Sequence, residues 1–326
     1  MQSFTLSRPD SLESALAAGR AGGAAYIAGG TDLMQLLKNN VIAPRQLVDL
    51  EPLELRGIEA TSERLRRGAL ATMSEVGSHP AVRQGWPAIA EALLLSASPQ
   101  VRNMGTMGGN LLQRTRCGYF RDTGFACNKR EPGSGCPAIR GENRMLAVLG
   151  VSEHCIATHP SDMPVALMAL DAAVELRSPD GDSRTLPLAQ FYRLPGDTPH
   201  VETALRPGEL ITAIIVPASA AASRSVYVKV RDRESFEFAL VSAAAGLDVR
   251  DGVIRDARVA MGGVGTIPWR APQVEAVLRN QPARPEILAQ AAAKATEGAQ
   301  SATQNAFKLK LAQRTVLRAL QTASAA

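Results

Sequence analysis

Four cysteines lie close together in a chain of 326 residues that contains no others. They are Cys117, Cys127, Cys136 and Cys155, with the spacing C-x9-C-x8-C-x18-C. Most of this region, residues 112–143, is rich in Arg, Gly and Pro and has almost no apolar periodicity. A loop of this length inside a domain is usually functional, or is held by something other than a hydrophobic core.

Thiols grouped in this way could serve one of several chemistries. Structural zinc sites usually contain cysteine pairs only a few residues apart, and no such pair is present. Disulfides would require export to an oxidising compartment. Four thiolates on a long loop also match all-cysteine ligation of an iron–sulfur cluster, where the cluster itself orders the segment. The spacing favours the cluster and leaves zinc, disulfides and a purely structural role open.

A first Gly-Gly segment stands at residues 26–33, Tyr-Ile-Ala-Gly-Gly-Thr-Asp-Leu. A buried strand is expected to enter the turn, and a helix is expected to leave it. Glycines let backbone N–H groups converge on an anion, and the positive end of a helix dipole favours a phosphate there. A plain turn between strand and helix is the alternative.

A second Gly-Gly segment, Thr106-Met107-Gly108-Gly109-Asn110, has hydroxyl and amide donors and no bulky charge. Two such nests fit a ligand with two phosphates better than either does alone, although two unrelated turns would give the same pattern. The chain lacks G-x-G-x-x-G and G-x-x-x-x-G-K-[ST], so neither a Rossmann site nor a P-loop explains the glycines. It also lacks G-x-S-x-G and H-E-x-x-H, and its four histidines are scattered.

The elements that must position these segments read as two α/β regions followed by an α+β region. In residues 1–55, Asp10 and Glu13 resemble a capping box, and strands are expected near 24–28 and 48–50. Between residues 56 and 222, the expected strands are 66–70, 145–151 and 174–177, and the expected helices are 74–79 and 86–97. After that come strands at 226–230, 239–249 and 253–262, with Asp251-Gly252 as a hairpin turn, and then helices at 271–278, 285–294 and 305–320.

Composition excludes several classes of protein. The net charge is +5, but basic and acidic residues are interspersed and aromatic residues make up only 4% of the chain, so no nucleic-acid surface is expected. No apolar run approaches the ~18–20 residues of a membrane span. The N-terminal residues lack the pattern of a secretory signal, so export would depend on a partner.

Several segments, in their order along the chain, resemble one known family. They are residues 27–33, residues 102–111, His-Pro-Ser-Asp-Met at 159–163, Lys-Val-Arg at 229–231, Met-Gly-Gly-Val at 261–264 and Asn-Ala-Phe-Lys at 305–308. Over essentially its whole length the chain resembles the FAD-binding medium subunit of the xanthine oxidase family of molybdenum hydroxylases. Most such subunits lack the cysteine insertion, which looks like the [4Fe–4S]-bearing insertion of bacterial periplasmic-type aldehyde oxidoreductases. The flavin subunit of 4-hydroxybenzoyl-CoA reductase carries a comparable insertion.

The resemblance implies an α+β fold. A two-part FAD-binding domain of the PCMH/vanillyl-alcohol-oxidase type would span residues 1–222, with subdomains 1–55 and 56–222 and a [4Fe–4S] insertion at about 112–156. A smaller α+β domain of CO-dehydrogenase-flavoprotein type would span 223–326.

The resemblance also implies site residues. FAD would be bound by Tyr26, Ile27, Ala28, Gly29, Gly30, Thr31, Asp32, Leu33, Thr106, Gly108, Gly109, Asn110, Asp162, Ile211 and Lys229. The first eight would surround the pyrophosphate, Ile211 would pack on the cofactor, and Lys229 would lie near the flavin ring. The [4Fe–4S] cluster would be ligated by Cys117, Cys127, Cys136 and Cys155.

The implied function is electron transfer, because the molybdenum active site would lie on another chain. Electrons from aldehyde oxidation would arrive from a large molybdenum-cofactor subunit through a small [2Fe–2S] subunit of a heterotrimer and leave to an external acceptor. NAD-reducing members carry an acidic stretch where this chain has Arg-Glu-Ser-Phe-Glu-Phe at 233–238, so an acceptor other than NAD is expected. The periplasm, reached by co-export with a signal-bearing subunit, is the expected compartment, with the cytoplasm as the alternative. Other functions left open are a related molybdenum hydroxylase, a 4-hydroxybenzoyl-CoA reductase-like enzyme, a zinc-stabilised binding module and a stand-alone flavin oxidase.

Overall fold

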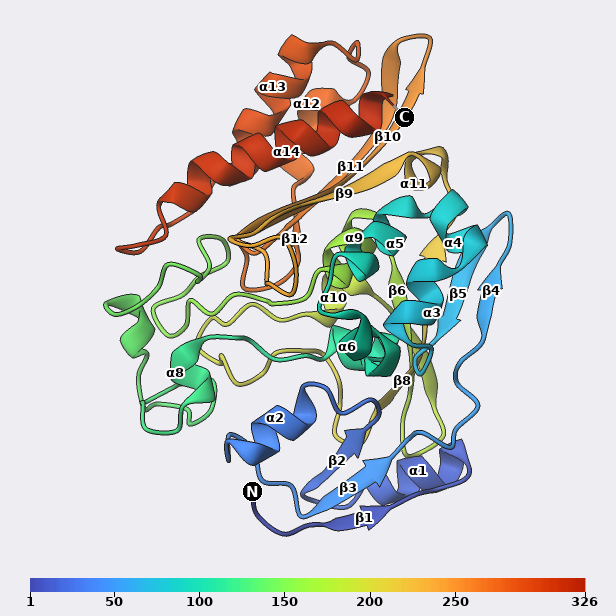
Figure 1. Ribbon diagram of the computed structural model, residues 1–326, viewed down its shortest axis with the longest axis vertical. Helices are drawn as coiled ribbons and strands as arrows, with labels where there is room; N and C mark the ends of the chain where they lie inside the picture. The colour runs from blue at the N-terminus through green and yellow to red at the C-terminus, as the bar shows by residue number, and fades with distance from the viewer. Residues whose placement is uncertain (326) are drawn as a thin grey trace.

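The computed structural model describes residues 1–325 and contains three β-sheets that follow one another along the molecule (Figure 1). The N-terminal sheet lies at one end, a five-stranded sheet with its helices lies in the middle, and the C-terminal sheet with its helices lies at the other end. The α+β fold predicted from the sequence is confirmed.

The N-terminal sheet is parallel and has the strand order β1-β3-β2. Its elements are β1 (Thr5–Ser7), α1 (Leu12–Gly19), β2 (Ala24–Ile27), α2 (Leu33–Lys38) and β3 (Gln46–Asp49). Helix α1 begins after Ser11, whose side chain accepts a hydrogen bond from the N–H of Ser14, while the Ser14 side chain accepts one from the N–H of Ser11. The capping box expected from Asp10 and Glu13 is therefore wrong, because the helix starts one residue later.

The middle sheet is antiparallel, with the order β4-β5-β8-β6-β7. Its strands are β4 (Ile58–Ala60), β5 (Arg64–Gly68), β6 (Ala173–Arg177), β7 (Ser183–Pro187) and β8 (Leu210–Pro217). The accompanying helices are α3 (Met73–Ser78), α4 (Pro80–Gly85), α5 (Pro87–Leu94), α6 (Pro99–Met104), α7 (Met107–Leu111), α9 (Met163–Ala169) and α10 (Leu188–Phe191).

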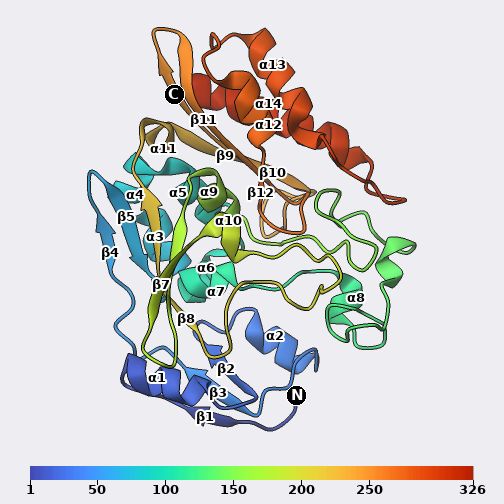
Figure 2. The same ribbon diagram turned by 180° about the vertical axis from the view of Figure 1, so that it is seen from behind.

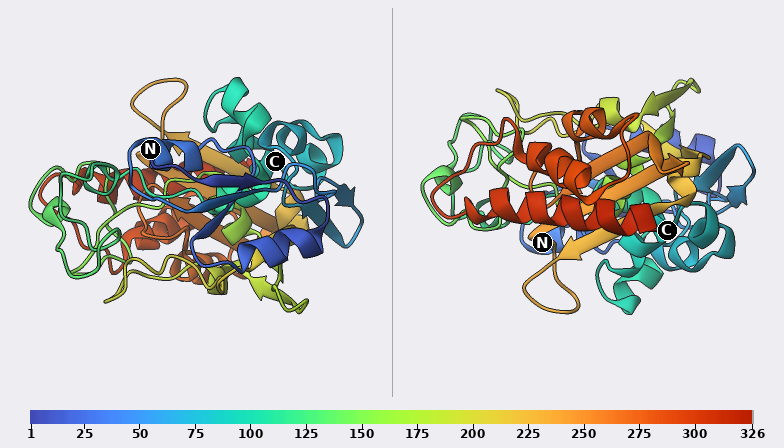
Figure 3. Two further views of the ribbon diagram at one scale, coloured as in Figure 1. Left: turned by 90° about the horizontal axis from the view of Figure 1, so that it is seen from below. Right: turned by 90° about the horizontal axis from the view of Figure 1, so that it is seen from above.

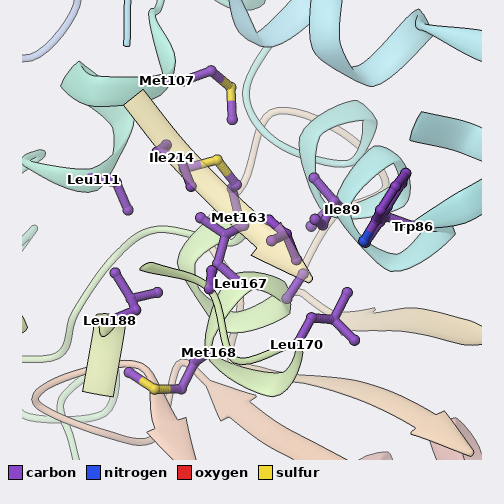
Figure 4. Packing of buried hydrophobic residues seen from close by; sticks show 14 of the residues in the cluster. Trp86, Ile89, Met107, Leu111, Met163, Leu167, Met168, Leu170, Leu188 and Ile214 are labelled. Carbon is purple, nitrogen blue, oxygen red and sulfur yellow. The ribbon is translucent and has the colours of Figure 1, made fainter. Parts of the chain in front are cut away.

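A core lies between this sheet and its helices (Figure 4). All seven residues of α9 are buried, and Met163 and Leu167 pack near Ile89 of α5 and Ile214 of β8. Burying each such side chain contributes about 1.5–3 kcal/mol. This packing fixes the start of α9, and with it the position of Asp162.

The cysteine insertion projects from one side of the molecule, beside α2 and the chain leading into the last helix (Figure 2). It contains only α8 (Gly118–Arg121) and a 3-10 turn, η1 (Pro137–Ile139). The prediction of a segment without a core was wrong: Phe120, Leu146 and Ile156 form a small cluster with the buried thiols and with Leu36 of α2. The residues of this core are too far apart in the sequence to produce a periodic pattern of apolar residues.

The C-terminal sheet is antiparallel, in the order β12-β11-β10-β9. Its elements are α11 (Ala220–Ser223), β9 (Ser225–Val230), β10 (Val241–Arg250), β11 (Val253–Gly262), β12 (Trp269–Arg270), α12 (Pro272–Leu278), α13 (Pro285–Ala293), η2 (Lys294–Thr296) and α14 (Phe307–Ala325). Helix α14 lies across the outer face of β9 and β10 (Figure 3). The domain boundary expected at residue 222 falls inside α11.

One predicted strand is absent. Residues 145–151 were expected to be extended, but the structure assigns them to no strand. Instead, the N–H groups of Val148 and Leu149 both donate to the carbonyl of Val264, and Leu149 makes an isolated bridge to Gly265. The apolar run therefore marks a buried crossing to the C-terminal sheet.

Candidate functional site

The first Gly-Gly turn connects β2 to α2 and passes very close to another segment. A Cβ on Gly29 would lie 1.8 Å from the carbonyl oxygen of Met104, and Gly30 has a φ of +67°. Larger residues cannot occupy these positions without moving the backbone. The glycines therefore bring the start of α2 against the end of α6, and the turn borders a cavity.

The second Gly-Gly segment forms the first turn of α7. Thr106 caps this helix and accepts a hydrogen bond from the N–H of Gly109 at 3.2 Å. The amide of Asn110 is held by Ser161, whose hydroxyl donates to its Oδ1 at 2.5 Å. A Cβ on Gly108 would lie 3.1 Å from that of Ala69, so the helix packs closely on the end of β5.

Both segments line one cavity of about 500 Å³. All the residues expected to bind FAD border this cavity: Tyr26, Ile27, Ala28, Gly29, Gly30, Thr31, Asp32, Leu33, Thr106, Gly108, Gly109, Asn110, Asp162, Ile211 and Lys229. They come from the N-terminal sheet, the middle sheet and β9. The structure therefore brings together in one place segments that are up to two hundred residues apart in the chain.

A buried hydrogen-bond network centres on Asp162. Its carboxylate accepts hydrogen bonds from Lys229 Nζ at 2.8 Å, from the Tyr227 hydroxyl at 2.6 Å and from the Ser96 hydroxyl at 2.9 Å. Burial, together with the adjacent Asp162 charge, raises the pKa of Tyr227 well above its usual value, so the phenol stays protonated and donates. The network holds the Lys229 ammonium at the cavity wall.

Tyr227 and Ser96 were missed by sequence reasoning. Tyr227 could have been found from the sequence. Residues i and i+2 of a strand share a face, and Lys229 had already been selected as a cofactor residue. Ser96 carried none, since it follows α5 and reaches Asp162 only through tertiary packing.

The carboxylate of Asp32 faces the cysteine insertion. It accepts hydrogen bonds from the N–H of Arg114 and from Nη2 of Arg121, both at 2.8 Å, and it forms an ion pair with Arg116 Nη1 at 3.0 Å. The sequence marked Asp32 as a cofactor residue but gave no sign of these three arginine partners. The first Gly-Gly turn and the insertion are thus directly connected.

The four cysteines line one small pocket and are all free thiols. Burial raises the pKa of Cys117 to about 11 and raises the pKa of Cys136 and Cys155 as well. At neutral pH these side chains are therefore protonated unless a bound metal stabilises the thiolates. Among residues 1–325, no three His, Cys, Asp or Glu side chains stand close enough to hold a single metal ion.

The insertion is held mainly by side chains that bind backbone carbonyls. Arg130 donates to the carbonyls of Tyr119 at 3.0 Å and Phe120 at 2.8 Å, and also to that of Phe125. Asn143 exchanges hydrogen bonds with Gln304, its N–H donating at 3.0 Å and its Oδ1 accepting at 2.9 Å. These contacts close the loop on itself and attach it to the start of the last helix.

A second cavity, of about 310 Å³, lies between the two sites. It shares Arg114 with the large cavity, and it shares Lys129 and Cys155 with the cysteine pocket. Glu202 accepts from Arg114 at 2.5 Å and from Lys129 at 2.9 Å. Burial alone would raise the pKa of Glu202, but these two cations outweigh it and hold that pKa below its usual range. The two sites are therefore linked by a charged network.

The loop between β9 and β10 borders the mouth of the large cavity. Phe236 and Phe238 line the cavity and remain exposed, and the Arg116 guanidinium lies 4.9 Å from the centre of the Phe238 ring. Residues 233–238, from which an acceptor other than NAD is expected, belong to this loop. Within residues 1–325, no helix is long and apolar enough to span a membrane.

Two known families match the chain end to end. Residues 2–219 match the FAD binding domain in molybdopterin dehydrogenase, and residues 226–323 match the CO dehydrogenase flavoprotein C-terminal domain.

Individual proteins are similar over comparable lengths. The aldehyde oxidoreductase FAD-binding subunit PaoB of Escherichia coli is 48% identical over 100% of this chain and 99% of its own. The carbon monoxide dehydrogenase medium chain of Afipia carboxidovorans is 29% identical over 85% of this chain and 80% of its own. Among solved structures, carbon monoxide dehydrogenase from Hydrogenophaga pseudoflava superposes with a TM-score of 0.77 at 26% identity. That match covers 99% of this chain and 98% of the other.

Proposed function

This chain belongs to the family of FAD-binding medium subunits of molybdenum hydroxylases, and from that membership we propose that it is the FAD- and [4Fe–4S]-binding subunit of a heterotrimeric molybdenum aldehyde oxidoreductase. Its partners would be a small [2Fe–2S] subunit and a large molybdenum-cofactor subunit. The chain would pass electrons from aldehyde oxidation on those partners to an external acceptor.

The observation that carries the proposal is the single cavity lined by both glycine nests and by the Asp162–Lys229 pair. Its residues fit FAD, because the first Gly-Gly turn leads into a helix start that suits a phosphate, and the positive side chains of Lys229 and Arg116 border the cavity. FAD supplies a centre that exchanges one or two electrons. The 48% identity to an aldehyde oxidoreductase subunit along the full length supports the choice of aldehydes as substrates.

The [4Fe–4S] assignment rests on the donor set of the insertion. Four free thiols line one pocket, which is the ligand count that such clusters require. Cys117, Cys127, Cys136 and Cys155 would be the ligands.

An absorbance spectrum of the purified native complex tests the cofactors together with a metal assay. Flavin bands over a broad iron–sulfur shoulder, with about four iron atoms per chain beyond those of the [2Fe–2S] subunit, are expected. Flavin without the added iron would indicate a plain flavin subunit, and equimolar zinc would contradict the cluster. Cys136→Ser should lose the added iron, whereas Thr123→Ser, in an exposed part of the insertion, should keep it.

The external acceptor is proposed to be other than NAD. The loop of residues 233–238 places Phe236 and Phe238 at the cavity mouth in place of an acidic stretch. Anaerobically reduced complex mixed with NAD⁺ should stay reduced, whereas a quinone or ferricyanide should reoxidise it. Reoxidation by NAD⁺ at a comparable rate would contradict this assignment.

The proposed compartment is the periplasm, reached by export of the folded complex with a signal-bearing partner. Cell fractionation tests it: the chain should appear in the periplasm only when the small subunit keeps its own N-terminal segment. Retention of the whole complex in the cytoplasm would contradict the proposal.

A further inference from the structure

Asp32 stands where the cofactor cavity meets the cysteine insertion. Its side chain is 14% exposed, and its carboxylate is shared by the Arg114 N–H, Arg121 Nη2 and Arg116 Nη1, all within 3.0 Å. The same residue closes the glycine turn that fits the FAD diphosphate. A lone carboxylate at that place would repel phosphate, so the arginines must offset its charge.

Arg116 is fixed at the cavity wall by contacts on three sides. Besides Asp32, its Nη1 contacts the Gln35 side chain of α2 at 3.1 Å, and its guanidinium lies over the Phe238 ring. The side chain borders the cavity. Its Nε is shielded from solvent and has no hydrogen-bond partner in the structure.

Although its Nε is shielded, the Arg116 side chain is 27% exposed and borders the cavity. With Arg116 and Arg121 against Asp32, the formal charges sum to +1 beside the glycine turn, which favours an anion there. Phosphate oxygens are strong acceptors for guanidinium donors. Arg116 immediately precedes the thiol of Cys117, so its position depends on how the insertion is folded.

We propose that Arg116 is a FAD-binding residue supplied by the cysteine insertion, with Asp32 as the positioning residue that holds it toward the diphosphate. The inference rests on the proposed function, since it requires FAD in the cavity. It goes further by making the insertion part of the flavin site. Loss of order in the insertion then weakens FAD binding, even though the glycine nests lie outside it.

The dissociation constant of FAD decides the matter, measured by flavin fluorescence on the purified complex after removal and re-addition of FAD. Arg116→Gln should weaken binding roughly 10- to 100-fold, the size expected for a charge-assisted hydrogen bond. The FAD affinity of Arg116→Lys should lie between those of the wild type and Arg116→Gln, because lysine keeps the charge and loses the planar donor set. Arg144→Gln is the matched control, because it removes an exposed charge from the same insertion outside the cavity.

Asp32→Asn separates two explanations, because they predict opposite changes in FAD affinity. If Asp32 positions Arg116, the variant binds FAD roughly ten-fold more weakly. If Asp32 merely repels the phosphates, the variant binds FAD more tightly, and the inference is overturned. Should Asp32→Asn fail to fold, as judged by iron content and thermal unfolding, Arg116→Gln decides alone, and unchanged FAD affinity in that variant overturns the inference.

The two proposals fail in different ways. A wild-type complex that binds no flavin contradicts the proposed function. A wild-type complex that binds flavin, with Arg116→Gln binding it equally well, contradicts only the role of Arg116.

Discussion

The cofactor cavity and the cysteine pocket are neighbours, yet they are built from different kinds of contact. The cavity is bordered by the ends of strands and helices whose backbones are paired and whose far sides pack into the main core. The pocket is bordered by a loop with one four-residue helix, and that loop is tied together by arginine and asparagine side chains bound to carbonyls. The cavity is therefore shaped by the fold itself, whereas the shape of the insertion depends on a few side chains and, in our proposal, on a cluster.

This difference has an energetic consequence. Damage to the cavity should spread through the domain, because its residues share the core. Damage to the insertion should leave the stability of the core unchanged, because few of its contacts belong to regular structure. Its effect on the cavity should be limited to weaker FAD binding through Arg116. Single substitutions can test that contrast, and the largest effect is expected at the cavity.

The largest effect is expected from Asp162→Asn. The change leaves the Lys229 ammonium, 1% exposed, without its counter-charge, and breaking such a buried pair costs about 3–5 kcal/mol. Urea unfolding should show this loss in global stability. Asp180→Asn, in an exposed pair with Arg20, should change stability by less than about 0.5 kcal/mol. Equal losses of stability in the two variants would show that the buried Asp162–Lys229 pair contributes no more to stability than an exposed pair.

Gly29→Ala should come next. Its Cβ would overlap the Met104 carbonyl, and relieving such an overlap costs about 1–3 kcal/mol and shifts the turn away from α6. FAD content per chain should fall with the melting temperature. Gly57→Ala is the control, because a Cβ there meets no atom within 4 Å. Full FAD content in Gly29→Ala would show that the turn can accommodate a Cβ without disturbing the cavity.

Arg130→Gln should loosen the insertion without destabilising the core. It removes a guanidinium that binds several carbonyls of the loop, and hydrogen bonds to charged groups contribute about 1.5–3 kcal/mol. Amide exchange should therefore accelerate roughly ten-fold or more across residues 118–135 while β6 and β8 stay protected. A uniform acceleration over the whole domain would contradict the local character of the insertion.

A pH-dependent effect concerns Lys308, which joins the insertion to the C-terminal sheet by donating to the carbonyls of Met145 at 2.9 Å and Gly263 at 2.6 Å. Burial, with a further contribution from Arg144, lowers its pKa from 10.5 to about 7. Between these two pH values the unfolded chain binds one more proton than the folded chain, so this residue makes stability rise with pH. Below pH 7 it contributes no pH dependence.

Lys308→Met should remove that rise. Urea midpoints measured at intervals from pH 7 to pH 9 provide the comparison with the wild type. Parallel curves for both proteins would show that Lys308 does not titrate in this range.

The sequence predicted best the elements whose signal is local. The strand over residues 253–262 and the turn at Asp251-Gly252 match the structure, and both turn residues have positive φ, as that hairpin requires. The two glycine segments were recognised because a left-handed or crowded backbone position restricts the choice of residue. Patterns of this kind need no knowledge of distant parts of the chain.

What the sequence could not predict depends on distant partners. Leu210–Pro217 has no polar alternation because both its faces are covered, and so β8 was not foreseen. The same holds for Arg116 and Arg121, whose role follows from a carboxylate more than eighty residues earlier. Charged residues on a loop look solvated until a tertiary partner is known.

The pairing of Asn143 with Gln304 spans 161 residues, and it has a consequence for biosynthesis. A ribosome delivers the chain from its N-terminus, so all four thiols emerge long before the segment at 302–308 that fastens the insertion in place. The loop thus lacks this last attachment throughout most of translation, and it gains it only when the last helix has been made. Delivery of iron and sulfide would have its widest access in that interval, and a chain truncated before residue 302 would be left with unprotected thiols.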